Sequence, residues 1–207
     1  SGYLKYSNFT NNKAYMHSTE TYKPTVRGGG LYLESFSGIE ECIFINNSCY
    51  AYEEKTIING GCMFIGGNTD TLKNIEKSKF YNNTAYSYEK NSIIEGGAVY
   101  LSNFFSIFTL CSFINNTVNA NGVDQSLCGG AVYCYFKQIC FYHCDFKNNR
   151  AVNGCEISFQ FMDFQHLTVS NCYFEEDFNL NYQTKSMIYL KTIKRPKRIC
   201  FHLFSNT

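Results

Sequence analysis

Two short motifs recur at nearly constant spacing, and this repeat constrains the fold more than any other feature of the chain. The motif Phe-x-Asn-Asn occurs five times, at intervals of 35, 36, 33 and 33 residues, beginning at Phe9, Phe44, Phe80, Phe113 and Phe146. A Gly-Gly pair follows each of the first four copies, beginning at Gly28, Gly60, Gly96 and Gly129. A degenerate sixth copy, Phe-Glu-Glu-Asp, begins at Phe174. Two different motifs that keep a constant spacing are typical of stacked repeats.

The residue types within one unit predict short strands joined by turns. Two residues before the Phe lies Ser or Cys, at Ser7, Cys42, Ser78, Cys111, Cys144 and Cys172. The Cys-x-Phe spacing has period two, which puts both side chains on one face of a strand. Asn tolerates the left-handed backbone conformation, and a Gly pair allows a second turn. We therefore expect two or three short strands in each unit.

A unit of this kind cannot bury its apolar face by itself, whereas stacked units can. Strands of successive units would then pair in parallel at about 4.8 Å per coil. This predicts an all-β protein, a parallel β-helix of about six coils with a row of loop insertions. A β-propeller has repeats of similar length and is the alternative. It does not require Asn and Cys columns in register, and the chain contains no Trp.

The repeats resemble those of the polymorphic outer-membrane protein (Pmp) family, which belongs to the pectin-lyase-like group of right-handed parallel β-helices. The matching stretches are "FINN" with "GGCMF", "FYNN" with "GGAVYL", and "FINN" with "GGAVYC". The resemblance covers residues 6 to about 157 and weakens towards and over 158–207: "NGCEI" at 153–157 replaces the Gly pair, and "FEED" at 174–177 replaces the Asn pair. It implies a right-handed β-helix on a secreted or cell-surface protein, often an adhesin.

Charge and hydropathy narrow the possible partners. The formal net charge of the 207 residues is +1 and only 17% of them are charged, which argues against nucleic-acid binding. The longest apolar runs are too short to span a bilayer. The basic stretch at 194–198 is interpreted as a solvated turn. Because the sequence begins inside a repeat, we expect one β-helix domain over 1–207 that is a fragment of a longer, extracellular or cell-surface chain.

Insertions between the Asn pair and the Gly pair are the candidate binding loops. They cover residues 15–27, 50–59, 86–95 and 119–128, and the fifth copy lacks one. Loops on a rigid scaffold often carry binding, and Tyr offers a large contact area with a polar tip. The candidate residues in the two most similar loops are Tyr50, Tyr52, Glu53, Tyr86, Tyr88 and Glu89. The alternative is that these tyrosines pack at the loop bases.

The cysteines favour a structural interpretation. Most of the eleven lie in columns that hold Ala, Ser, Gly or Leu in other copies, which predicts small buried thiols. The stretch "CFYHC" at 140–144 resembles a metal-ligand spacing, but on a strand His143 would face away from the cysteines. No metal site or cofactor is therefore predicted. Disulfides between adjacent coils, Cys111–Cys144 or Cys144–Cys172, remain an alternative for an extracellular protein.

Four Asn-x-Ser/Thr sequons are candidate glycosylation sites: Asn8, Asn46, Asn82 and Asn115. Three of them use the first Asn of a pair. We expect the second Asn, at 47, 83, 116 and 149, to be the turn residue and to form an inward ladder. The first Asn would then be exposed to solvent.

These observations predict a non-catalytic scaffold of the adhesin type, or a stalk, that binds a protein or glycan of a host or neighbouring cell through its loops. The alternative is a polysaccharide-active lyase or hydrolase whose catalytic residues lie outside this fragment. Such an enzyme needs carboxylates clustered on neighbouring coils. The outward columns on either side of the repeated Phe are not acidic.

Overall fold

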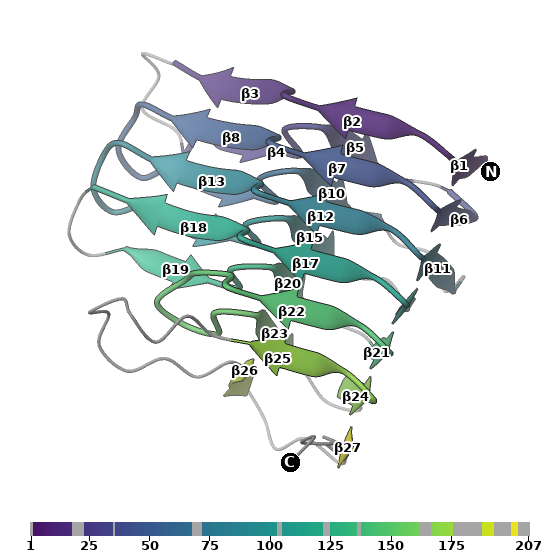
Figure 1. Cartoon of the computed structure of the whole chain (residues 1–207). Helices are drawn as coiled ribbons and strands as arrows, with labels where there is room; N and C mark the ends of the chain where they lie inside the picture. The colour runs from purple at the N-terminus through teal and green to yellow at the C-terminus, as the bar shows by residue number, and fades with distance from the viewer. Residues whose placement is uncertain are drawn as a thin grey trace.

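The chain forms a parallel β-solenoid, in which strands of successive coils stack in register (Figure 1). The computed structural model describes residues 2–17, 23–34, 36–67, 72–102, 105–121, 125–135, 138–161, 167–175, 188–192 and 200–202. All regular secondary structure within these ranges is β-strand. The predicted all-β solenoid of stacked parallel coils is therefore confirmed.

Three sheets form what we call the body of the solenoid. Sheet A contains β1 (Tyr3–Lys5), β6 (Gly38–Glu40), β11 (Lys73–Glu76), β16 (Ser106–Thr109), β21 (Ile139–Tyr142), β24 (Leu167–Ser170) and β27 (Cys200–His202). Sheet B contains β2 (Asn8–Thr10), β7 (Ile43–Ile45), β12 (Lys79–Tyr81), β17 (Ser112–Ile114), β22 (Asp145–Lys147) and β25 (Tyr173–Glu175). Sheet E contains β5 (Leu31–Leu33), β10 (Met63–Ile65), β15 (Val99–Ser102), β20 (Val132–Tyr135), β23 (Ile157–Phe161) and β26 (Ile188–Thr192).

Two further sheets form what we call the arm. Sheet C contains β3 (Lys13–Met16), β8 (Ser48–Ala51), β13 (Thr84–Ser87) and β18 (Thr117–Ala120). Sheet D contains β4 (Thr25–Arg27), β9 (Ile57–Asn59), β14 (Ile93–Glu95) and β19 (Ser126–Cys128). A complete coil thus has five strands rather than two or three, because the predicted loop insertions contain strands. Four coils are complete; six coils and right-handedness stay predictions.

The repeated Phe forms one internal stack in the body. Phe44, Phe80 and Phe113 are fully buried on sheet B. The ring centroids of Phe44 and Phe80 lie 4.9 Å apart, and those of Phe80 and Phe113 lie 4.8 Å apart, with nearly parallel planes. The stack extends to Phe9 above and to Phe146 and Phe174 below. The spacing matches that of neighbouring strands, so each coil adds one ring to the core.

The second Asn of each pair forms the predicted inward ladder at the corner between sheets B and C. The backbone N–H and Nδ2 of Asn83 both donate to Oδ1 of Asn116, at 3.0 and 2.9 Å. Nδ2 of Asn116 also donates to the carbonyl oxygen of Phe80 on the preceding coil, at 2.9 Å. The same pattern links Asn47 to Asn83 and Asn116 to Asn149. Each buried amide therefore satisfies backbone groups that the corner leaves unpaired.

The turn residue of the pair is the first Asn, which corrects the prediction. Asn46, Asn82 and Asn115 have φ values of 55°, 54° and 57°, in the left-handed region. The second Asn is not in that region, since its side chain must point inward to continue the ladder. The predicted difference in burial is confirmed, because these first Asn are exposed and their partners are buried.

The first Gly of the pair is required by a turn, and the second is required by a close backbone approach between coils. Gly96 has a φ of +79° at the turn between sheets D and E. A Cβ on Gly97 would overlap the carbonyl oxygen of Gly130 and the backbone of Thr117 on the next coil. The first Gly thus supplies the conformation, and the second allows the arm and the body to meet.

The arm has a separate core of small and medium side chains between its two sheets. It consists of Val26, Cys49, Ala51, Ile58, Ala85, Ile94, Val118, Leu127 and Ala151. Narrow side chains let sheets C and D pack face to face, whereas the body encloses stacked rings. The arm is therefore a thin double layer that projects from the body.

The fifth coil shows how the solenoid continues without a full arm. Only two isolated bridges remain, from Thr117 to Arg150 and from Cys128 to Asn153. The amide ladder ends in this coil, where Nδ2 of Asn149 donates to the buried carboxylate of Glu156. Beyond it, β24 and β27 pair in parallel.

Candidate functional site

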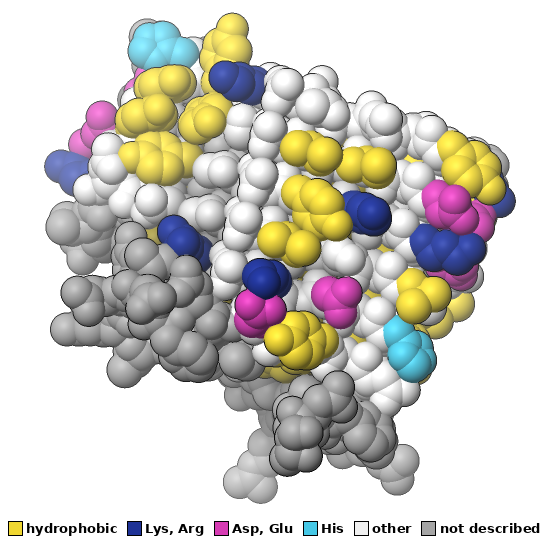
Figure 2. Space-filling model, in the orientation of Figure 1, with side chains coloured by type: hydrophobic (Ala, Val, Ile, Leu, Met, Phe, Trp, Pro, Cys, Tyr) yellow, Lys and Arg dark blue, Asp and Glu magenta, His cyan; other side chains and the backbone are white. Residues whose placement is uncertain are grey.

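The outer face of sheet C carries two columns of aromatic side chains parallel to the coil axis. Tyr15, Tyr50 and Tyr86 are Cα partners on β3, β8 and β13. His17, Tyr52 and Tyr88 follow two residues later on the same coils. We call these six residues the tyrosine surface; Figure 2 shows apolar side chains gathered there, over β3, β8 and β13.

The rings of the tyrosine surface pack against one another and remain accessible. The rings of Tyr52 and Tyr88 stack with centroids 4.6 Å apart and planes 7° apart. Tyr86 meets the Tyr88 ring edge to face at 4.6 Å. Tyr15, Tyr52 and Tyr88 nevertheless have 72%, 43% and 41% of their surfaces exposed. An exposed aromatic cluster with polar tips is a typical recognition surface.

Polar and charged side chains at the arm tip pair along the coil axis. Nδ1 of His17 lies 3.3 Å from a carboxylate oxygen of Glu53. Nζ of Lys90 lies 3.3 Å from a carboxylate oxygen of Glu54 on the preceding coil. Burial by neighbouring side chains raises the pKa values of the Tyr86 and Tyr88 hydroxyls. Tyr86 and Tyr88 are therefore neutral hydrogen-bonding groups at physiological pH.

The structure brings the predicted loop residues together but changes their setting. Tyr50 and Tyr86 lie in strands β8 and β13, and Tyr52 and Tyr88 directly follow them. The insertions then continue as β9 and β14, whose Ile58 and Ile94 are buried in the arm core. Shortening both insertions to the length of the fifth copy would therefore remove sheet D strands as well as surface residues. Whether these tyrosines bind a partner stays a prediction.

The four candidate glycosylation sites occupy two different structural settings. Asn8 lies on the outer face of β2, whereas Asn46 occupies an exposed left-handed corner. Asn82 and Asn115 occupy the same corner on the next two coils. All four side chains are accessible on the surface. Their modification stays a prediction.

The cysteine column beside the Phe stack has a specific hydrogen-bonding role. The Sγ of Cys42 donates to the carbonyl oxygen of Glu40 at 3.3 Å, and the Oγ of Ser78 donates to that of Glu76 at 2.9 Å. A small side chain with a donor therefore suits this corner, which explains the alternation of Cys and Ser. Cys111, Cys144 and Cys172 are free thiols in the structure.

Burial also keeps a thiol outside this column, that of Cys49, protonated and unreactive. Cys49 lies in the arm core, and burial raises the pKa of its thiol to about 12. The thiolate is the nucleophile and the metal ligand, so a thiol of this kind suits packing. Among the described residues, no three His, Cys, Asp or Glu side chains are grouped to hold a metal ion.

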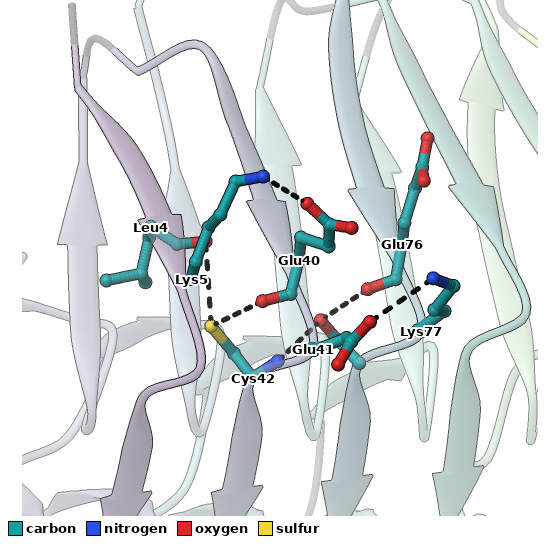
Figure 3. A network of polar contacts seen from close by, with 8 residues as sticks. Leu4, Lys5, Glu40, Glu41, Cys42, Glu76 and Lys77 are labelled. Carbon is teal, nitrogen blue, oxygen red and sulfur yellow. Dashed lines mark hydrogen bonds and ion pairs between the residues drawn. The ribbon is translucent and has the colours of Figure 1, made fainter.

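A carboxylate cluster does lie on neighbouring coils, at a column that the sequence reasoning did not consider. Glu40 and Glu76 are Cα partners on sheet A, and Glu41 follows at the corner (Figure 3). Lys5 donates to Glu40 and lowers the pKa of that carboxyl, and Lys77 pairs with Glu41 at 3.2 Å. A general acid for glycoside cleavage needs a raised pKa. Comparing the residues two positions before the Cys or Ser of each repeat would have revealed this column.

The fold and surface define a class of protein, a parallel β-solenoid with a projecting arm. Comparison with known proteins adds no closer assignment: no family model, no curated protein and no solved structure matches the chain. Within the described part of the chain, no helix is long and apolar enough to cross a membrane. The basic stretch at 194–198 lies outside the described residues.

Proposed function

We propose that the chain is a non-catalytic, extracellular or cell-surface scaffold of the adhesin type that binds a protein or glycan through the tyrosine surface. The observation that carries this proposal is the exposed pair of aromatic columns on a rigid parallel sheet. The motif resemblance to Pmp repeats supports a right-handed β-helix on a cell surface and does not specify the ligand.

A stable scaffold explains why the surface residues can be this exposed. The body holds its own core, and the Asn ladder fixes each coil against the next. Tyrosines on the arm thus contribute little to folding and keep their rings in one arrangement, which lowers the ordering cost of binding. Aromatic anchors surrounded by paired charges match the usual composition of interface hot spots.

The test uses binding of the purified chain to intact cells. The double substitution Tyr52→Ala/Tyr88→Ala should weaken binding at least about tenfold, as expected for interface tyrosines. Tyr173→Ala is the control, because it removes an even more exposed ring, from sheet B. Equal binding by the double variant and the wild type, with unchanged circular dichroism, would show that this surface is not the binding site.

An enzyme that uses the sheet A carboxylates of this chain is a different case from the predicted alternative, whose catalytic residues lie outside residues 1–207. To test it, the chain is incubated with neutral and acidic polysaccharides, and new reducing ends and unsaturated products are measured. Their release, and its loss in a Glu40→Gln/Glu76→Gln variant, would favour such an enzyme. We expect no release, because the lysine pairing of Glu40 opposes the protonated state that an acid catalyst needs.

A further inference from the structure

Three cysteines follow one another on consecutive coils in the column beside the Phe stack. Cys111, Cys144 and Cys172 directly precede β17, β22 and β25. The backbone N–H of Asp145 donates to the carbonyl oxygen of Cys111, and that of Tyr173 donates to the carbonyl oxygen of Cys144, each at 2.9 Å. Both bonds continue the parallel pairing of sheet B, so each cysteine lies opposite the next one along the coil axis.

The spacing and contacts of these side chains suit a disulfide. Neighbouring parallel strands lie about 4.8 Å apart, within the Cα–Cα range of about 4.4–6.8 Å for disulfides. All three thiols are buried in the body core, and that of Cys144 forms hydrogen bonds with those of both Cys111 and Cys172. Cys111 and Cys172 are two coils apart, about 9.6 Å, which is too far for a disulfide. Any disulfide within this group must therefore include Cys144.

The amide ladder favours one of the two partners of Cys144. The backbone N–H and Nδ2 of Asn116 both donate to Oδ1 of Asn149, which fixes the fourth coil against the fifth. The sixth copy has Phe-Glu-Glu-Asp in place of Phe-x-Asn-Asn, so its sequence cannot continue this ladder. A disulfide needs its two Cβ atoms about 3.8 Å apart, so the coils must approach locally. The fifth and sixth coils can make this adjustment with less strain, which favours Cys172 over Cys111.

Cys42 is an internal control within the same column. Its Sγ bonds to the carbonyl oxygens of Leu4 and Glu40, in the same kind of corner (Figure 3). Its neighbours in the column are Ser7 on the preceding coil and Ser78 on the next one. Cys42 therefore shares the burial and the hydrogen-bonding pattern of the three cysteines, but it has no thiol beside it in the column.

We propose that Cys144 and Cys172 form a disulfide site, which is oxidised by a small-molecule disulfide such as oxidised glutathione. The cross-link would join the fifth and sixth coils where the amide ladder stops. This inference goes beyond the proposed function and does not depend on the tyrosine surface. Oxidants of this class are typical of the extracellular and secretory compartments.

The oxidation consists of two thiol–disulfide exchanges. The Cys172 thiolate attacks one sulfur of oxidised glutathione, which breaks the glutathione S–S bond and releases one glutathione thiolate. The Cys144 thiolate then attacks the Cys172 sulfur and releases the second. Two protein S–H bonds and one glutathione S–S bond are thus replaced by one protein S–S bond and two glutathione S–H bonds, and glutathione takes up both electrons. The hydrogen bond to Cys144 and burial raise the pKa of the Cys172 thiol, so the exchange should be slow.

Peptide mapping tests this site directly. The folded chain is equilibrated with mixtures of reduced and oxidised glutathione, the remaining thiols are alkylated in denaturant, and the peptides are identified by mass spectrometry. The wild type should yield a cross-link between Cys144 and Cys172 and an alkylated Cys42. Oxidation should also raise the urea midpoint of unfolding, because the cross-link restricts the unfolded chain.

Serine variants separate the three cysteines without disturbing the corner, because Ser already occupies this column on the first and third coils. Cys144→Ser should abolish both the cross-link and the rise in urea midpoint. Cys172→Ser should transfer the cross-link to Cys111 with a lower yield. Cys42→Ser should behave like the wild type in both measurements.

Three results would overturn the proposal. The first is a folded wild-type chain in which Cys144 and Cys172 stay fully alkylatable at every glutathione ratio. The second is a cross-link that does not include Cys144, and the third is an unchanged rise in urea midpoint in Cys144→Ser. A wild type that joins Cys144 mainly to Cys111 would contradict the choice of partner. Attachment to cells through the tyrosine surface is measured separately, so failure of one proposal leaves the other standing.

Discussion

The body and the arm are built from the same repeat, yet they bury different kinds of residue. The body stacks full-sized rings such as Phe80 and Phe113, and its core continues past the fourth coil. The arm buries mainly small and aliphatic residues such as Ala85 and Ile94, and it is reduced to two bridges at the fifth coil. The difference teaches that the three sheets of the body are enough to form a coil. The arm adds exposed surface and buries only small and aliphatic side chains.

The largest effect is expected at the junction between body and arm. Asn116→Ala removes the acceptor of two Asn83 donors and the donor to the Phe80 carbonyl. These three buried groups each lose a partner, and Nδ2 of Asn83 keeps only its bond to the Phe44 carbonyl oxygen, so the expected cost is on the order of 5 kcal/mol of unfolding free energy. Urea denaturation measures this loss. The control is Asn115→Gly, which keeps the left-handed corner and should change stability little.

The Phe stack of the body should be nearly as sensitive. Phe113→Ala deletes a fully buried ring that stacks between Phe80 and Phe146. The expected loss is roughly 3–5 kcal/mol, as for other buried aromatic deletions. A loss below about 1 kcal/mol in chemical denaturation would contradict a tightly packed inward stack.

A matched pair of smaller deletions compares the two cores directly. Ile75 in the body and Ile94 in the arm are both fully buried on strands of the third coil. Ile75→Val should lower global stability by about 1 kcal/mol. Ile94→Val should lower it less, because the thinner arm can open without unfolding the body. The two variants are compared by the midpoint of thermal unfolding; an equal or larger shift for Ile94→Val would indicate one cooperative unit.

The smallest effect is expected at the sheet A ion pairs. The hydrogen bond from Lys5 lowers the pKa of Glu40, so this carboxylate contributes stability above its unfolded pKa. The contribution is lost as the pH falls through the lower, folded-state pKa. Glu40→Gln should therefore reduce stability slightly at neutral pH and not at strongly acidic pH. Asp145→Asn, at another exposed carboxylate, is the control for a general charge effect.

Most of the body could be predicted from the sequence because its columns repeat. The inward position of each sheet B strand holds a ring, and each ladder position of the first five copies holds an amide, so the residue types of Phe44 and Asn47 recur at a constant spacing. The corner between sheets A and B could not be predicted. Residues as different as Glu41, Leu110 and His143 adopt positive φ there, and such types carry no turn signal.

The arm was only partly predictable, for a physical reason. Its inward residues, such as Ala51 and Ala85, are too small to mark a core by hydropathy, and the strands are three or four residues long. Tyrosines with an alternating pattern were visible, but their position on a sheet depends on pairing between coils. The end of the tyrosine column follows only from the register of the fourth coil, which pairs Asn119 with Tyr86.

Hydrogen exchange of the third coil tests the central claim, that a self-sufficient body carries a separately opening arm. The amide of Lys79 in β12 donates to Cys42 in the body, and the amide of Ile93 in β14 donates to Thr56 in the arm. The account predicts that the β12 amides exchange only through global unfolding, whereas the β14 amides exchange through a local opening of lower free energy. Equal opening free energies for β12 and β14, both matching that of global unfolding, would contradict it.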